Sequence, residues 1–309
     1  MLFVSLGCAN KVESQALDSS TTTPQKFSFQ ELWAKVASSP LETLPQNRVS
    51  FGSLSSFSHN RVLDDAQRTI RDTSDILEPF DKLAHPNGIC LNGIWSIDKE
   101  NIYSGYFKKG SKGLVIARAS TALSNTKAGA SRAFGFAGKI FPTTDPTLKP
   151  SVRANFFLIE DLGGTDAKHF ADVALSNEPS ITPTLEVATN LLYVLKITRA
   201  FALADKNPTI RQLYEISELG EAKNQKIITP KWMKIEVQGA KRYDKIDFRD
   251  ELKEATDNRL LFNIFVANKS VGESKNWQEI GIMSFEKSVV SKTCDHQLHF
   301  HHPKWRDEL

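Results

Sequence analysis

A succession of short apolar segments separated by turns constrains what this chain can fold into. Five of them follow one another: GICLNGIWSI (88–97), YSGYFKKG (103–110), GLVIARAST (113–121), FGFAGKIFPT (134–143) and ANFFLIED (154–161). They are rich in β-branched and aromatic residues, and Gly, Pro, Asn or Ser residues lie between them, which is typical of β-strands. Strands joined by such short connections pair in antiparallel fashion. The pattern therefore predicts antiparallel strands in a core or barrel.

Helical patterns lie around these strands. We expect helices at 27–40, 183–206, 208–223 and 247–255, and further strands at 231–240, at 260–268 and after residue 277. No linker rich in Pro or Gly divides residues 60–309. The sequence therefore predicts one α+β domain over residues 28–309, an antiparallel β-barrel with associated helices. Residues 1–27 are predicted to be a separate signal-like lead and polar tether.

The first residues allow two interpretations. MLFVSLGCAN is a short apolar stretch that contains Leu-Gly-Cys, and a polar tract follows it. This is the arrangement of a bacterial lipoprotein signal, which would make the chain an exported protein anchored through Cys8 on the periplasmic side of a membrane. The stretch lacks a basic start and its apolar part is shorter than usual. A cytoplasmic protein with a chance cysteine is therefore the alternative, and the C-terminal RDEL is interpreted as a chance match to a retrieval signal.

Composition excludes some classes of function. The 309 residues carry a formal net charge of +3. No basic block concentrates this charge, so nucleic acid is not expected as a partner. No interior apolar run reaches the ~18 residues of a membrane-spanning helix. Cys90 and Cys294 show no zinc spacing; they are either a disulfide or two buried thiols, and the sequence leaves both open.

A run of histidines near the C-terminus is the first candidate for chemistry. It comprises His296, His299, His301 and His302 within HQLHFHHP. The run lacks HExxH spacing, and a zinc site needs three or four converging ligands, so a structural run is favoured over a metal site. The sequence also contains no GxSxG motif and no glycine-rich phosphate loop after a strand, which excludes the serine-hydrolase and P-loop patterns.

An ordered set of residues remains. His85 precedes the first strand, and the others are Arg118, Ser120 and Thr121 in ARAST, Arg132, Gly135, Phe136 and Lys139 in SRAFGFAGKIFPT, and Phe156 and Phe157 in ANFFLIED. Taken one at a time, each has an ordinary structural role. Phenylalanines most often pack in a core, and a lone arginine in a strand usually pairs with a carboxylate.

In order and spacing this set resembles the haem catalase family. The family's distal motif has glycines three and eight residues after a histidine, matched here by His85, Gly88 and Gly93. ARAST is similar to the family's RFST strand, RAFGFAGKIFPT to its RGFAvKFYT segment, and NFFLIED to its VFFIRD strand. The resemblance covers about residues 80–300 and is most specific between 85 and 160.

The resemblance implies a barrel with haem against it and a peroxide or organic hydroperoxide as substrate. It gives His85 the role of the acid–base group, with Ser120 orienting it, and makes Arg118 the partner of a haem propionate. Further contacts with the cofactor are expected from Lys82, Arg132, Phe136 and Phe156. A homo-oligomer is compatible with this picture.

The chain also departs from the family pattern. Ser151 stands where the family has its distal asparagine, and no tyrosine has the context of the iron-binding RxxxY helix. Both groups contribute to peroxide chemistry, so we expect weak activity at haem, with His299 or His301 as candidate iron ligands. The second hypothesis is a non-enzymatic, lipid-anchored protein of catalase fold that binds a hydrophobic ligand or a protein partner without haem.

Overall fold

The computed structural model describes part of the chain, and the fold is built from that part. The described residues are 24–41, 74–79, 88–121, 134–142, 154–160, 212–215, 228, 230, 232–239, 247–267 and 277–300. Within these ranges, no helix is long and apolar enough to cross a membrane.

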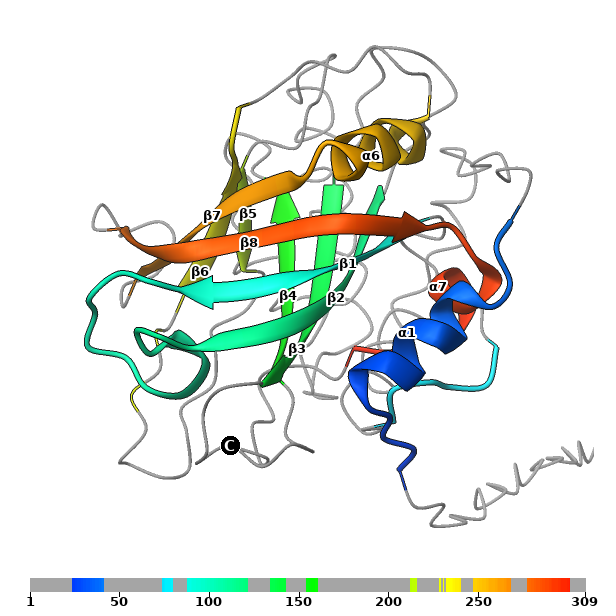
Figure 1. Cartoon of the computed structure of the whole chain (residues 1–309), viewed down its shortest axis with the longest axis horizontal. Helices are drawn as coiled ribbons and strands as arrows, with labels where there is room; N and C mark the ends of the chain where they lie inside the picture. Colours follow the sequence, from blue (N-terminus) through cyan, green and yellow to red (C-terminus); the bar gives the residue numbers. More distant parts are fainter. Residues whose placement is uncertain are drawn as a thin grey trace, which may run out of the picture.

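Eight antiparallel strands form a closed barrel in which each strand pairs with its neighbours in the sequence and the last pairs with the first (Figure 1). The strands are β1 (Gly88–Ile97), β2 (Lys112–Thr121), β3 (Phe134–Pro142), β4 (Ala154–Glu160), β5 (Gln212–Glu215), β6 (Trp232–Val237), β7 (Leu260–Ala267) and β8 (Gln278–Val289). The predicted α+β class with an antiparallel barrel is therefore confirmed. Closure leaves no open edge, so every strand has two hydrogen-bonded neighbours.

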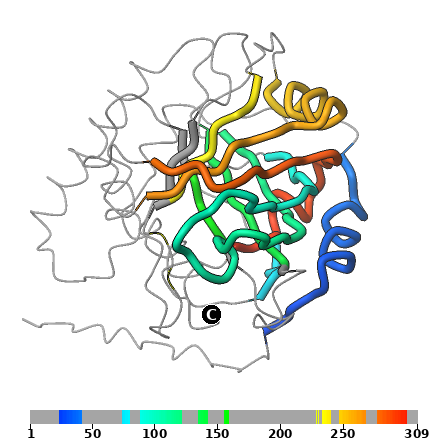
Figure 2. Tube along the Cα trace, turned by 60° about the vertical axis from the view of Figure 1, so that its left-hand side comes forward, coloured from blue at the N-terminus to red at the C-terminus, as the bar shows by residue number. Residues whose placement is uncertain are grey.

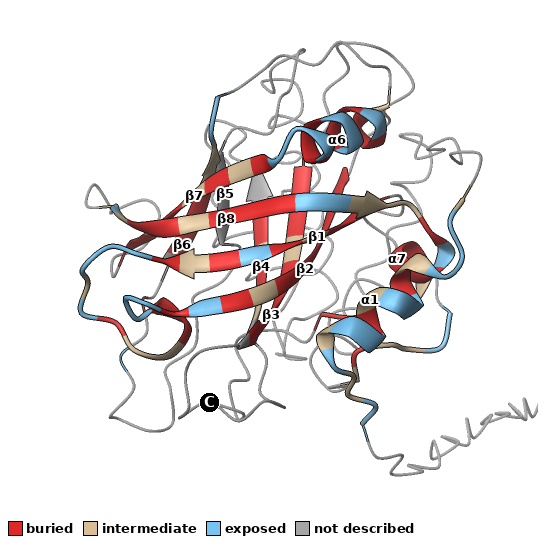
Figure 3. Cartoon of the chain, viewed as in Figure 1, coloured by how far each residue is buried: buried red, intermediate tan, exposed pale blue. Residues whose placement is uncertain are grey.

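Side chains of each strand alternate between the barrel interior and its outer face, as strand geometry requires. On β2, Val115, Ala117 and Ala119 belong to the interior core, whereas Ile116 packs outside with Cys90 and Phe141. Arg118 and Ser120 have the same parity as Ile116 and so share the outer face. Both faces of β2 are buried (Figure 3), because a second layer covers the barrel there.

Aromatic rings fill the interior. The ring of Phe136 lies 6.3 Å from that of Phe156, 5.6 Å from that of Phe262 and 5.8 Å from that of Phe285. The fully buried Trp95 donates its indole N–H to the carbonyl oxygen of Tyr106 at 2.8 Å. The helix α6 (Phe248–Asp257) packs against β8, β7 and β1 and brings Phe248 edge-on to Phe134.

The second layer consists of three segments that are distant in the sequence: 24–41, 74–79 and 291–300. Together we call them the cover. They include α1 (Phe29–Ala37) and α7 (Lys292–His296), which lie against each other on one side of the barrel (Figures 1 and 2). Their apolar side chains, among them Leu32, Val36 and Leu298, pack on the outer face of β1, β2 and β3.

Helix α1 starts where the sequence predicts a helix, and its first turn explains why. Ser28 and Glu31 form a capping box, in which each side chain accepts a hydrogen bond from the other residue's backbone N–H. These hydrogen bonds to Ser28 lower the pKa of Glu31 below its ordinary value of 4.5. The stabilisation from the carboxylate is therefore present above that value and is lost as the pH falls through the lowered pKa.

Two predicted elements were wrong. Residues 103–110 form no strand: a 3-10 turn, η1 (Gly105–Phe107), lies there, and Gly105 and Gly110 adopt positive φ angles that reverse the chain. Within the predicted helix 208–223, residues 212–215 form β5, because pairing with β4 and β6 closes the barrel and outweighs the helical spacing. The predicted helix 183–206 lies outside the described residues.

The interior rings give the first testable prediction. Replacing Phe136 with Ala should lower the free energy of unfolding by about 3–5 kcal/mol, because the ring is buried among three others and leaves a cavity. Chemical denaturation followed by circular dichroism measures the change. Ile102→Ala is the control, since Ile102 is 67% exposed. A loss of less than about 1 kcal/mol for Phe136→Ala would contradict the packed interior.

Candidate functional site

The candidate site lies where the cover meets β1 and β2. Arg118 projects from β2 toward the cover, and its cross-strand partner on β1 is Cys90. Arg118 is only 5% exposed. A guanidinium cannot lose its charge in a protein, so a buried arginine requires an anion beside it.

Helix α7 provides that anion through Asp295. The helix begins at Ser291, whose hydroxyl accepts a hydrogen bond from the Cys294 N–H at 3.0 Å and donates one to the carbonyl oxygen of Val36. Cys294 forms a disulfide with Cys90, which settles the alternative that the sequence leaves open. Asp295 follows Cys294 in the sequence, and Arg118 is the cross-strand partner of Cys90. The disulfide therefore holds Asp295 beside Arg118.

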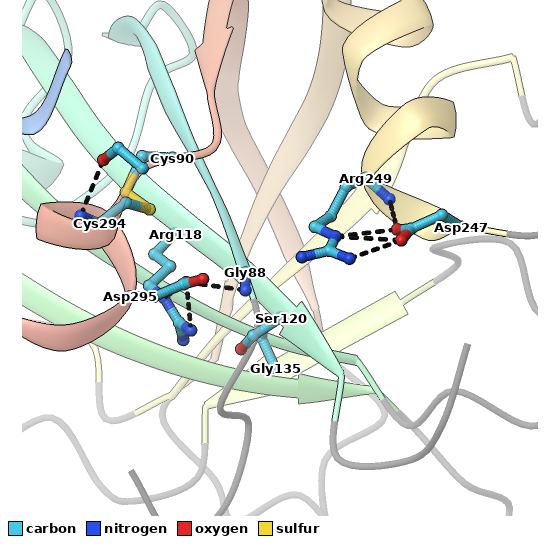
Figure 4. Close-up of polar contacts among 10 residues, drawn as sticks. Gly88, Cys90, Arg118, Ser120, Gly135, Asp247, Arg249, Cys294 and Asp295 are labelled. Atoms are coloured by element: carbon cyan, nitrogen blue, oxygen red, sulfur yellow. Dashed lines mark hydrogen bonds and ion pairs between the residues drawn. A yellow bond between two sulfur atoms is a disulfide. The ribbon is translucent and has the colours of Figure 1, made fainter. Parts of the chain in front are cut away.

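A single carboxylate oxygen of Asp295 accepts three hydrogen bonds from the barrel (Figure 4). The donors are the backbone N–H of Gly88 at 2.8 Å, Nη2 of Arg118 at 2.9 Å and Nε of Arg118 at 3.3 Å. Asp295 is 2% exposed, so the pair is shielded from water on both sides. Charge-assisted hydrogen bonds in such surroundings are strong, and the loss of either residue takes a buried partner from the other charge.

The two glycines of the predicted histidine motif are required by close packing. A Cβ on Gly88 would come within 2.6 Å of Nε of Arg118, and one on Gly93 within 2.0 Å of the carbonyl oxygen of Ser284. Gly88 therefore makes room for the guanidinium and supplies the N–H that meets Asp295. Gly93 lies at the irregularity where the register of β1 against β8 shifts.

Ser120 lies on the same outer face as Arg118, nearer the start of β1. It pairs with Gly88 across β1 and β2, and its hydroxyl donates a hydrogen bond of 3.4 Å to the carbonyl oxygen of Gly135. His85 is three residues before Gly88 but lies outside the described residues, as do Lys82, Arg132 and His301. Their predicted roles remain predictions.

Phe136 and Phe156 are not beside Arg118 and Ser120. Both rings belong to the interior core, on the opposite face of the barrel wall. The structure therefore separates two pairs of residues that the resemblance places in one pocket. The reason is strand parity: on β2 the even-numbered residues face outward, whereas on β3 and β4 the even-numbered Phe136 and Phe156 face inward.

A second buried ion pair lies on the same outer face. Nζ of Lys139, on β3, lies 2.8 Å from Oδ1 of Asp75 in the cover, and these side chains are 1% and 0% exposed. The other oxygen of Asp75 accepts the N–H of Phe27 at 2.8 Å. The sequence did not predict the roles of Asp75 and Asp295. Nothing in the residues around them distinguishes these buried carboxylates from carboxylates on a protein surface.

The predicted role of His299 as an iron ligand stays a prediction, and the structure shows one of its contacts. His299 lies in the cover, where its Nδ1 is 2.9 Å from the carbonyl oxygen of Ser74. No group of three or more His, Cys, Asp or Glu in the described part of the chain could hold a metal ion. Arg249, at the start of α6, forms a local ion pair with the N-cap residue Asp247 at 2.6 Å (Figure 4).

No protein-family model matches the sequence, and no curated protein matches it significantly. The solved structures that are similar in fold include the following two. Both are catalases. A bacterial catalase is similar over 68% of this chain and 49% of its own, with a TM-score of 0.42 and 13% identity. A fungal catalase is similar over 87% of this chain and 64% of its own, with a TM-score of 0.44 and 12% identity. The chain thus spans about half of the first catalase and less than two thirds of the second.

The described residues do not fit haem in the way the resemblance implies. The arginine that would hold a propionate already holds the carboxylate of Asp295, and the hydroxyl of Ser120 is directed to the carbonyl oxygen of Gly135. The two phenylalanines expected to wall the pocket face the barrel interior. A carboxylate of the chain itself therefore stands where the cofactor's carboxylate was expected.

The buried pair can be tested by mutation. Asp295→Ala should lower the free energy of unfolding by about 3–5 kcal/mol, because it leaves Arg118 charged and buried without this partner. The double variant Arg118→Met/Asp295→Leu should lower the free energy of unfolding clearly less than Asp295→Ala does, since it removes both charges. Denaturant unfolding under oxidising conditions measures both.

A surface pair provides the matched control. Arg259 and Glu286 lie 3.4 Å apart and are both 60% exposed. Glu286→Ala should therefore change the stability by less than about 1 kcal/mol. If Asp295→Ala and Glu286→Ala changed the free energy of unfolding equally little, the buried pair would not stabilise the fold.

Proposed function

We propose that this chain is an exported, disulfide-bonded protein of catalase-like fold that acts as a binding protein without haem. The Arg118–Asp295 ion pair carries the proposal. A haem propionate that approached Arg118 would have to displace a buried carboxylate that accepts three hydrogen bonds, and would take this cationic partner from it. Because separating a buried ion pair is costly, this exchange is unfavourable.

The packing of the interior favours a protein partner over a ligand inside the barrel. Phe136, Phe156 and Phe262 pack ring against ring there. The outer surface carries apolar side chains on neighbouring segments: Ile102 is 67% exposed and Ile228 49% exposed. The backbone N–H of Ser104 donates to the carbonyl oxygen of Ile228, which brings these segments together. A partner with an apolar contact surface suits this arrangement.

The Cys90–Cys294 disulfide supports the export part of the proposal. Structural disulfides form and persist in oxidising compartments and are rare in the cytosol of mesophiles. An exported chain with lipidated Cys8 would meet such conditions on the periplasmic side. The lipid anchor is part of the proposal and rests on the sequence around Cys8.

Haem-dependent peroxide chemistry is the second candidate function, and the β1–β2 register favours it. Gly88 pairs with Ser120, and His85 lies three residues before Gly88. Three residues span at most about 10 Å, so this register permits a His85–Ser120 contact of the kind that the resemblance implies.

A haem titration distinguishes the two functions. We expect no Soret band shift when haem is added to the full wild-type chain, and no peroxide consumption above that of free haem. Asp295→Asn removes the competing charge while keeping the shape, so haem binding by this variant alone would identify the ion pair as what excludes the cofactor. A wild-type Soret band that disappears in His85→Ala would instead establish the second candidate.

The location of the protein can be tested separately. In a bacterial host, the full chain should be recovered from the membrane fraction with a diacylated Cys8, as seen by mass spectrometry. Cys8→Ser should abolish the modification and release the protein from membranes. Recovery of the wild-type chain in the cytosol with reduced Cys90 and Cys294 would contradict export.

A further inference from the structure

The cover holds itself together through backbone hydrogen bonds between its three segments. The N–H of Asp75 donates to the carbonyl oxygen of Gln25, and the N–H of Leu77 donates to that of Gln297, both at 2.9 Å. The N–H of His299 donates to the carbonyl oxygen of Asp75 at 3.0 Å. The segments 24–41, 74–79 and 291–300 are therefore joined to one another as one structural unit.

Side chains, through ion pairs, apolar contacts and a disulfide, attach this unit to the barrel wall. In the described ranges, two side chains of the cover form ion pairs with the strands: Asp295 with Arg118 on β2, and Asp75 with Lys139 on β3. Apolar contacts add to these, such as the edge-on pair of Phe29 and Phe141 with ring centroids 5.4 Å apart. Two covalent connections join the described cover to the barrel: the main chain that runs from β8 into residues 291–300, and the disulfide between Cys90 and Cys294.

The disulfide and the first ion pair form one compact lock. Cys90 and Arg118 are cross-strand partners on β1 and β2, and Cys294 and Asp295 are consecutive in α7. The covalent bond therefore keeps the carboxylate at a high effective concentration beside the guanidinium. Without that bond, Asp295 would be held near Arg118 only by the main chain that continues from β8 and by noncovalent contacts.

We propose that the cover is a redox-locked unit: with the disulfide intact it stays on the barrel wall, and reduction lets it open as a whole while the barrel remains folded. A dithiol reductant carries out the step. One of its thiolates attacks a sulfur of the disulfide, and its second thiol resolves the mixed disulfide, so that Cys90 and Cys294 become thiols and the reductant becomes a cyclic disulfide.

Opening uncovers a face of defined chemistry. Arg118 and Lys139 project from this face, and apolar Ile116 and Phe141 lie between and beside them. The cationic groups then lack the carboxylates of the cover, so dissolved carboxylates compete with Asp295 for Arg118. Acetate should therefore favour the open state of the reduced protein, whereas chloride at the same ionic strength should do so less, because it cannot form the paired hydrogen bonds of a carboxylate.

Hydrogen exchange with mass spectrometry tests the lock on the full chain carrying Cys8→Ser, so that the dithiol acts on one disulfide only. After reduction, amides of 24–41, 74–79 and 291–300 should exchange together, roughly tenfold or more faster than in the oxidised protein. Amides of β1–β3 that are bonded between strands should keep their protection. Acetate should accelerate exchange of the cover in the reduced protein and leave the oxidised protein unchanged.

The variant Cys90→Ala/Cys294→Ala should behave like the reduced protein without any dithiol, which separates loss of the disulfide from other effects of the reagent. Unchanged exchange of the cover after reduction would overturn the proposal, and so would cover and barrel opening together. Equal effects of acetate and chloride would overturn the carboxylate competition. None of these outcomes depends on whether haem binds, so they are distinguishable from failure of the proposed function.

Discussion

A buried arginine needs a buried anion beside it, so the structure around Arg118 has to supply one. The anion comes from Asp295, which reaches it because a disulfide holds α7 over β1. Gly88 lacks a side chain, so the guanidinium fits beside β1 and the backbone N–H reaches the same carboxylate oxygen. The glycine, the arginine, the aspartate and the disulfide thus depend on one another, and a change in any one alters the environment of the others.

The same principle recurs at Lys139 and Asp75. Two cations on neighbouring strands are each matched by a carboxylate from a different segment of the cover, so charge specifies how the cover sits on the wall. This affects the meaning of the sequence motifs. Gly88, Gly93, Arg118 and Lys139 match a family pattern, yet each has a packing or charge-pairing role in this chain. A matched motif is therefore not by itself a matched site.

Much of the barrel was predictable from the sequence because its signals are local. Strands β1 to β4 coincide closely with the apolar runs at 88–97, 113–121, 134–143 and 154–161. Strand β5 was not predictable, since four residues with helical spacing become a strand only by pairing with β4 and β6. The partner of Arg118 was not predictable either, because Asp295 is 177 residues away and the local sequence pattern contains no information about it.

That separation also sets an order of events during biosynthesis. Strand β2 is complete long before Asp295 is made, so Arg118 has to stay hydrated, or pair temporarily with something else, until 177 further residues have been added. Contacts that join such distant residues form late and slowly. The cover can therefore be completed only after all eight strands have been made, because its last segment, residues 291–300, follows β8.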